Sequence, residues 1–274
     1  MNLKAEPKLE TCARARKSGA LRGLRALSAA LVLAVPGAWA QVGDAKLMLK
    51  AMSDYVGRQN TIELSFDSDI EVITPSLEKI QFTNSGDALL QRPNKLRAHR
   101  VGGYADVAMS FDGKTVSILG KHINAYAQFE APGSVDQLIA AMRAGHGVAL
   151  PFADLLLTSS YDALVAGVLE AKYIGRGVID GRECEHLAFR NFDTDWQLWI
   201  ETGASPIPRK MVITSKTLNS APQYTLRVKA WKTDVKPAAD AFVFLPPSNA
   251  KKLSPDGLIG LDELPPEAST ATRK

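Results

Sequence analysis

The sequence predicts an α+β protein built around one broad antiparallel β-sheet that a few short helices cover. Three observations lead to this prediction. Segments of alternating apolar and polar residues dominate the chain beyond residue 60, and short turns join most of them, as in antiparallel sheets. Helical periodicity is confined to the beginning and the middle of the chain. Strands and helices do not alternate regularly and no repeat has a fixed period, which argues against a parallel α/β fold or a solenoid.

The first 40 residues are expected to be a cleaved secretory signal peptide, which predicts a periplasmic protein. A basic stretch precedes an apolar run of about a dozen residues, shorter than the roughly 20 that a membrane span needs. The run ends at Ala38-Trp39-Ala40, a small-x-small pattern typical of signal peptidase sites. We therefore expect a mature chain that begins at Gln41 and has neither a transmembrane segment nor a lipid anchor. The alternative is an uncleaved anchor helix.

The charge of the mature chain gives no indication of a nucleic-acid partner. The whole chain has 33 Lys/Arg and 29 Asp/Glu, of which seven and two fall in residues 1–40. The remaining 26 basic and 27 acidic side chains give a net charge of −1, so the excess of positive charge belongs to the leader. We expect the most basic stretch, "RPNKLRAHR" at 92–100, to be the solvated face of a strand.

Residue patterns predict the helices and strands in order. Residues 44–58 have helical spacing, with Asp44 as the expected cap. Asp112-Gly113 and Asp180-Gly181 predict tight hairpin turns, and 84–86 a further turn or a bulge. Helices are also expected at 133–147, capped by Ser134, and in one or two short pieces within 151–169. Strands are expected at 61–74, 78–91, 95–101, 105–111, 115–119, 125–129, 169–179, 182–190, 196–201, 207–218 and 223–233.

The chemically active residue types form no recognisable catalytic or metal-binding pattern. The four histidines lack metal-ligand spacings, and Cys184 with His186 would need two further ligands. Cys184 is the only cysteine of the mature chain, because Cys12 lies in the leader, and we expect it to be a buried apolar side chain. The sequence contains no GxSxG elbow and no phosphate-binding glycine loop. We predict no metal, no cofactor and no enzymatic activity, with a hydrolase as the weakest alternative.

The segment "DTDWQLWIETGASPIPRKMVIT" at 193–214 predicts a hairpin with two unlike faces. Trp196, Leu198 and Ile200 share one face, while the residues between them share the other. The return strand begins with two basic residues, Arg209 and Lys210. We expect this pair to meet Asp195 or Glu201, as exposed ion pairs worth about 0–1 kcal/mol that set the register.

Three runs, "CEHLAFR" at 184–190, "DWQLWIE" at 195–201 and "PRKMVIT" at 208–214, resemble a family of predicted periplasmic bacterial proteins of unknown function. That family is related to the LolA/LolB lipoprotein-carrier superfamily, and the looser resemblance covers 47–247. It implies an unclosed β-barrel, which is a strongly curved antiparallel sheet capped by helices. In the lipoprotein carriers the cavity holds acyl chains, and related members bind lipids or act as envelope-stress sensors. The cargo-handling arginine of the carriers has no match by motif here.

We therefore expect a signal peptide at 1–40, an open-barrel domain at 41–250 and a mobile polar tail at 251–274. The predicted function is non-catalytic binding of a lipid, a lipoprotein acyl chain or another apolar ligand in the periplasm. The alternative is an envelope module that recognises a protein partner or senses stress without a bound lipid. Whether the sheet interior is a cavity or a filled core stays open. By strand parity the residues expected to line it are Leu64, Phe66, Met109, Phe111, Trp196 and Leu198.

Overall fold

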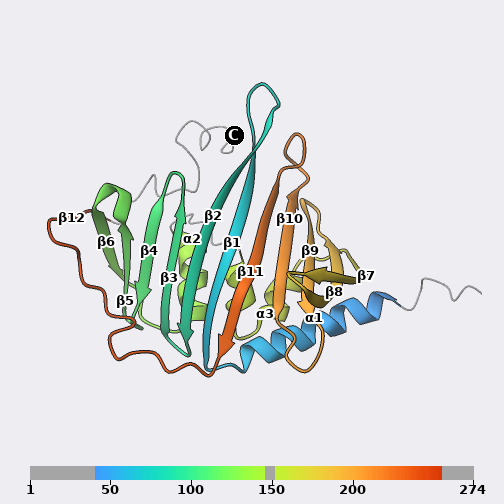
Figure 1. The fold of residues 1–274 in the computed structure, drawn as a ribbon, viewed down its shortest axis with the longest axis horizontal. Coiled ribbons are helices and arrows are strands. Elements are labelled where there is room, and N and C mark those ends of the chain that lie inside the picture. The colour runs from blue at the N-terminus through green and yellow to red at the C-terminus, as the bar shows by residue number, and fades with distance from the viewer. Residues whose placement is uncertain (1–40, 146–151, 255–274) are drawn as a thin grey trace, which may run out of the picture. The chain divides into compact units, whose positions relative to one another are not determined.

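A single antiparallel sheet organises the protein, as Figure 1 shows. The computed structural model describes residues 41–145 and 152–254, and within these ranges twelve strands follow the order β12-β6-β5-β4-β3-β2-β1-β11-β10-β9-β8-β7. The central pair joins β1 to β11, which are far apart in sequence, and so connects an N-terminal wing to a C-terminal wing. The strands are β1 Thr61–Ile73, β2 Lys79–Gln91, β3 Lys95–Gly102, β4 Asp106–Phe111, β5 Thr115–Gly120, β6 Ala125–Glu130, β7 Glu170–Ile179, β8 Arg182–Arg190, β9 Thr194–Glu201, β10 Pro208–Ser215, β11 Gln223–Thr233 and β12 Lys251–Lys252.

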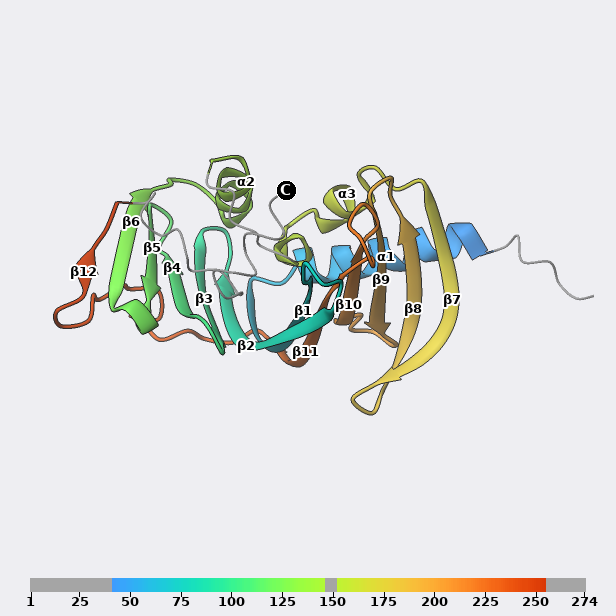
Figure 2. The ribbon, with the colours of Figure 1, turned by 90° about the horizontal axis from the view of Figure 1, so that it is seen from above.

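The sheet curves around its helices without closing into a barrel. Its two ends are β12 and β7, and Figure 2 shows the strands bending around one side on which α2 and α3 lie. Helix α1 packs against β7 and α3. This arrangement confirms the predicted fold class of a curved, unclosed antiparallel sheet with a few helices. The helices are α1 Gln41–Gly57, α2 Val135–Gly145 and α3 Ser160–Val165, with 3-10 turns η2 Lys121–Ile123 and η3 Ala153–Leu156.

Strand register places one apolar stripe of each strand on the concave side. Because side chains alternate between the faces, residues paired across neighbouring strands form rows that run across the sheet. One such row is buried over five strands, and it joins the core that α1 and α2 complete. Its members are Ile62, Leu90, Leu96, Phe111 and Val116.

The turn or bulge expected at 84–86 is wrong. Strand β2 runs through these residues without a break in its pairing with β1. The irregularity lies instead between β1 and β11, where the register shifts at Ser65 and Phe66. Gly86 has a packing role, because a Cβ there would lie 2.5 Å from Cζ of Phe66. The glycine therefore makes room for an aromatic ring that reaches across from the neighbouring strand.

The other element boundaries follow the sequence pattern closely. Helix α1 begins at Gln41, three residues before the expected Asp44, and β10 ends at Ser215 rather than at residue 218. The Asp180-Gly181 turn has the positive φ angles of a tight hairpin, +48° and +78°. Lys251–Lys252 pairs in parallel with β6, beyond the expected domain end at 250.

Several sequence predictions concern parts of the chain that the structure does not describe. The expected signal peptide at 1–40, the start of the helical region at Pro151 and most of the expected tail, 255–274, lie outside the described residues. Among the residues that are described, no helix combines the length and the apolar character needed to cross a membrane.

The cap of α2 gives a first testable prediction. Ser134 Oγ accepts a hydrogen bond from the backbone N–H of Gln137 at 3.2 Å, and Gln137 Oε1 accepts one from the backbone N–H of Ser134 at 2.8 Å. These two reciprocal bonds form a capping box. We expect Ser134→Ala to lower the free energy of unfolding by about 1 kcal/mol in chemical denaturation. Ser159 precedes α3 but makes no capping hydrogen bond with its side chain, so Ser159→Ala is the matched control. Equal losses in the two variants would contradict this role.

Candidate ligand-binding face

The six residues predicted to line the interior all lie on the concave face. Leu64 pairs with Ala88, which leads through Ala98 to Met109, so β1 and β4 contribute to one continuous row. Leu198 pairs with Met211, which leads through Leu226 to Ser68, so the β9 residues reach the same face from the other wing.

Four of these six side chains belong to the packed core. Phe111 and Leu198 are fully buried, and Leu64 is nearly so. Trp196 stacks on Phe189 with ring centroids 3.9 Å apart, and its indole N–H donates to Asn191 Oδ1 at 3.0 Å. These contacts give the four side chains a structural role, because core packing fixes their positions.

Phe66 and Met109 differ from the other four because they are only half-buried. Both pack against the core on the concave side, Phe66 from β1, which borders the C-terminal wing, and Met109 from β4. Met109 belongs to the row of Leu64. Phe66 belongs to the next inward-facing row, two residues further along β1. Of the six predicted residues, these two are the ones with side-chain surface left to contact a ligand.

A polar row that sequence reasoning missed crosses the centre of the concave face. Ser68 on β1 pairs with Asn84 on β2, and Arg100 lies on β3 one row away, paired with Gly86. Ser68 is fully buried and Asn84 is 5% exposed, yet Ser68 Oγ and Asn84 Nδ2 have no hydrogen-bond partner in the part of the chain that the structure describes. The signal was present in the sequence, because Ser68 interrupts an otherwise apolar inward stripe between Phe66 and Ile70.

Beyond the polar row the concave face becomes apolar again, along the hairpin of β1 and β2 that projects past the other strands (Figure 1). Ile70 pairs with Phe82, whose ring meets Tyr104 edge-on with centroids 5.6 Å apart. Further out, Ile80 is 42% exposed and Leu77 is 64% exposed. On β1 and β2 the polar row is thus flanked by Phe66 on one side and by Ile70 and Phe82 on the other, while Arg100 continues the Phe66 row onto β3.

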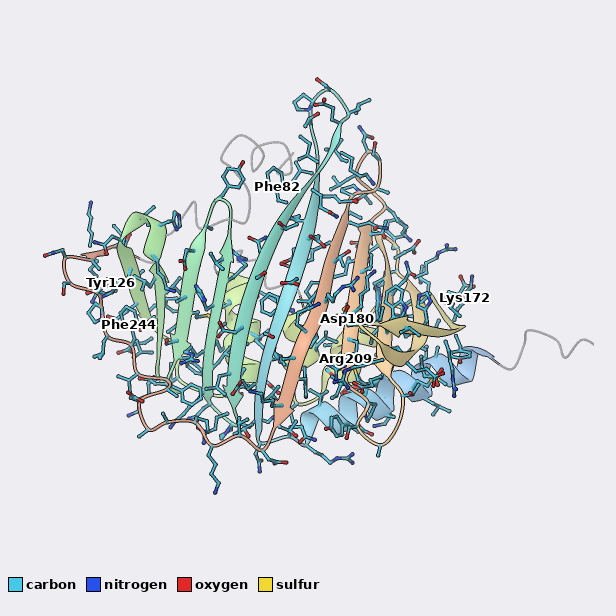
Figure 3. All side chains as sticks on the ribbon, viewed as in Figure 1. Phe82, Tyr126, Lys172, Asp180, Arg209 and Phe244 are labelled. Carbon is cyan, nitrogen blue, oxygen red and sulfur yellow. The ribbon has the colours of Figure 1, made fainter. Side chains whose placement is uncertain are left out.

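The outer face carries the cysteine and the histidine that could have indicated chemistry. The β7–β8 hairpin reaches β11, where Asp180 pairs with Arg227 and Lys229, and Figure 3 shows Asp180 beside that strand. Burial raises the pKa of the Cys184 thiol, which disfavours the reactive thiolate. His186 hydrogen bonds to Gln197 rather than to the thiol. Among the described residues no group of His, Cys, Asp or Glu could hold a metal ion.

The opening of β10 contains a buried ion pair. Arg209 Nε donates to Glu201 Oε2 at 2.6 Å, as expected from the sequence, but Arg209 is only 5% exposed, so the expectation of an exposed pair is wrong. Burial alone would raise the pKa of Glu201, and the hydrogen bonds from Arg209 and Arg182 outweigh it and hold that pKa below its usual range. The neighbouring cation, Lys210, lies over the Trp199 ring instead.

Asp195 does not meet the pair at 209–210. Its carboxylate binds Lys216 and Arg190, at 3.1 and 3.3 Å. These contacts lie at the other end of β9 from Glu201. Strand β9 therefore carries two ion pairs, a largely buried one at Glu201 and a more exposed one at Asp195.

The basic stretch at 92–100 is only partly a solvated face. Arg97 is exposed, as expected, but Arg92 turns inward and donates to the carbonyls of Gln59 and Leu156, at 3.1 and 2.8 Å. Burial lowers the pKa of its guanidinium group. The expectation of a solvated face is therefore wrong for Arg92, which ties the end of α1 to η3, and for Arg100, which lies on the concave face with a buried Nε.

The fold and the concave face together define a class: a helix-lined open barrel with an antiparallel, unclosed sheet. Within this class the sequence matches the family described as "Predicted periplasmic protein (DUF2092)" over residues 45–254, and the chain belongs to that family. The match covers the whole sheet and agrees with the resemblance seen in the sequence. A search of curated proteins found no match.

Several solved structures have a similar fold at low sequence identity. An uncharacterized conserved protein from Thermus thermophilus has a TM-score of 0.46 and 10% identity over 77% of this chain and 99% of its own. The Mycobacterium tuberculosis lipoprotein LppX has a TM-score of 0.44 and 14% identity over 71% and 98%. A chain of the Pseudomonas aeruginosa MucA/MucB complex has a TM-score of 0.41 and 16% identity over 73% and 60%.

Proposed function

We propose that the protein binds an acyl chain or another elongated apolar ligand on its concave face, in the periplasm, without catalysing a reaction. One observation carries the proposal: half-buried apolar side chains and unpartnered buried polar atoms occur together on that face, within the described part of the chain. A protein interior normally pairs its buried polar groups and packs its apolar ones closely. The half-buried apolar side chains and the unpartnered polar atoms are the groups that a bound ligand would cover and satisfy.

The surroundings of Phe66 support an elongated ligand. Its row continues through Gly86 on β2 to Arg100 on β3 and through Val228 on β11, so the ring lies between a glycine and a valine. Met109 adds an unbranched side chain that adapts to irregular apolar shapes. A chain of methylene groups laid along this surface would gain about 0.8 kcal/mol for each group that it buries.

Binding of a fluorescent long-chain fatty acid tests this function. We expect the wild-type protein to enhance the fluorescence at saturation, and Phe66→Gln and Met109→Gln to weaken binding about tenfold each, because each change removes more than about 1.4 kcal/mol of apolar contact. Ser110→Gln is the control, since it places the same side chain on the outer face beside Met109. No uptake by the wild-type protein, or equal losses in the control, would overturn the proposal.

A second candidate function is recognition of an envelope protein, and the exposed tip of the β1–β2 hairpin favours it. Leu77 at the tip is 64% exposed, Ile80 on β2 is 42% exposed, and Tyr104, which contacts Phe82, is 52% exposed, so exposed apolar side chains occur along this hairpin. Contiguous exposed apolar surface is typical of interaction sites. This candidate predicts no fatty-acid uptake at all, whereas the acyl-binding function predicts uptake that Leu77→Glu leaves unchanged.

A further inference from the structure

We propose that Ser68 and Asn84 form a binding subsite for an acceptor oxygen of the ligand, which makes the substrate class an acyl lipid with a carbonyl or carboxylate group rather than a plain hydrocarbon. This inference rests on the proposed function, because it places the polar group of the ligand on the same concave face. The subsite specifies the polar group that the concave face recognises, an acceptor oxygen, and the position on the sheet where that group binds.

The hydrogen-bonding inventory of the two side chains sets the chemistry. Asn84 Nδ2 is a donor only, and Ser68 Oγ can donate through its hydroxyl. The Asn84 carbonyl oxygen lies over Gly102, at 1.9 Å from where a Cβ would be, so the glycine leaves the space that the amide group occupies above β3. Its donor is buried and has no partner within the described residues, like Ser68 Oγ. Donors on two paired residues of neighbouring strands, neither bonded to a described acceptor, are complementary to an oxygen with two lone pairs.

The position of the row explains why such a group would lie there. Leaving a buried donor unsatisfied destabilises a protein, so an apolar residue would be the favourable choice at both sites unless a ligand satisfies them. The neighbouring rows present Phe66 before the pair and Phe82 after it, with the cation Arg100 beside Gly86, and no described protein group accepts a hydrogen bond from either donor. A ligand whose chain follows the strands would therefore bring its carbonyl oxygen to Ser68 and Asn84 while its methylene groups contact the flanking rows.

The test compares a ligand that has no acceptor oxygen with two ligands that have one. Diphenylhexatriene, a hydrocarbon that fluoresces when bound, reports occupancy of the face and has no acceptor oxygen. Dodecanoic acid and its methyl ester then displace it in competition. We expect Ser68→Ala and Asn84→Ala to weaken binding of the acid about tenfold and of the ester about threefold, in keeping with hydrogen bonds to charged and neutral groups, and to leave binding of the hydrocarbon unchanged.

A stability measurement separates this role from a merely structural one. Because Ser68→Ala removes an unsatisfied buried hydroxyl, the ligand-free variant should be as stable as the wild type or more stable, while its affinity for the acid falls. Ser65→Ala is the matched control, since this serine points outward on the same strand. Equal weakening for all three ligands, or wild-type protein that binds acid and hydrocarbon equally well, would overturn the subsite alone. Wild-type protein that binds none of the three would overturn the proposed function as well.

Discussion

Leu198→Ala is expected to lower the free energy of unfolding by about 2–5 kcal/mol, measured by chemical denaturation of the ligand-free protein. Leu198 is fully buried on β9 and packs in the row that leads through Met211 towards the centre of the sheet. The truncation would leave a cavity in close-packed surroundings that relax only partly.

The control for this prediction makes the same chemical change at an exposed position. Leu169, just before β7, is 70% exposed, and Leu169→Ala should change stability by no more than about 0.5 kcal/mol. If Leu198→Ala were as mild as Leu169→Ala, the assignment of the β9 stripe to the packed core would be wrong.

Glu201→Gln is expected to lower the free energy of unfolding by about 2–3 kcal/mol at neutral pH, because it leaves the nearly buried guanidinium of Arg209 without its carboxylate. Breaking a fully buried ion pair typically costs about 3–5 kcal/mol, and the partial exposure of Glu201 reduces that figure. Asp195→Asn removes a more exposed pair on the same strand and should cost less than about 1 kcal/mol.

Replacing both partners should recover much of the loss, because removing the guanidinium as well leaves no buried charge without its partner. We therefore expect Arg209→Met in the Glu201→Gln background to be more stable than Glu201→Gln alone. A double variant that loses the sum of both single effects would show that the pair is not the coupled unit described above.

The pH dependence of stability gives the same pair a second readout. The pKa of Glu201 is lower in the folded protein than its ordinary value, so its contribution to stability is fully present above about pH 4.3 and is lost as the pH falls through the folded-state pKa. The Glu201→Gln variant should consequently lose less stability than the wild type as the pH falls below about 4.3. Parallel profiles for the two proteins would contradict this assignment.

Local patterns were sufficient to predict most of the architecture. Alternation in β1 and β9 indicated which residues share a face, and the two Asp-Gly pairs located tight turns, because both signals depend on only a few neighbouring residues. The turn or bulge expected at 84–86 failed for the opposite reason. Gly86 accommodates Phe66 of another strand, and composition alone does not distinguish a packing glycine from a turn glycine.

The candidate site was less accessible to sequence reasoning because it depends on cross-strand partners. All six predicted lining residues point inward, but whether each one packs in the core or stays half-buried follows from the helices above it. Arg209 was expected in solvent, and its burial depends on tertiary packing around the pair with Glu201. Ser68 and Asn84 belong to different strands and become a pair only through the register of β1 with β2.

Native mass spectrometry of the protein purified from the periplasm of cells that express the full chain tests acyl binding most directly. The account predicts a species heavier than the polypeptide by the mass of an acyl lipid, which organic extraction releases and identifies. The bound fraction should fall in Phe66→Gln and stay unchanged in Ser110→Gln. A mass equal to that of the polypeptide alone, together with no uptake of the fluorescent fatty acid by the purified protein, would contradict the account.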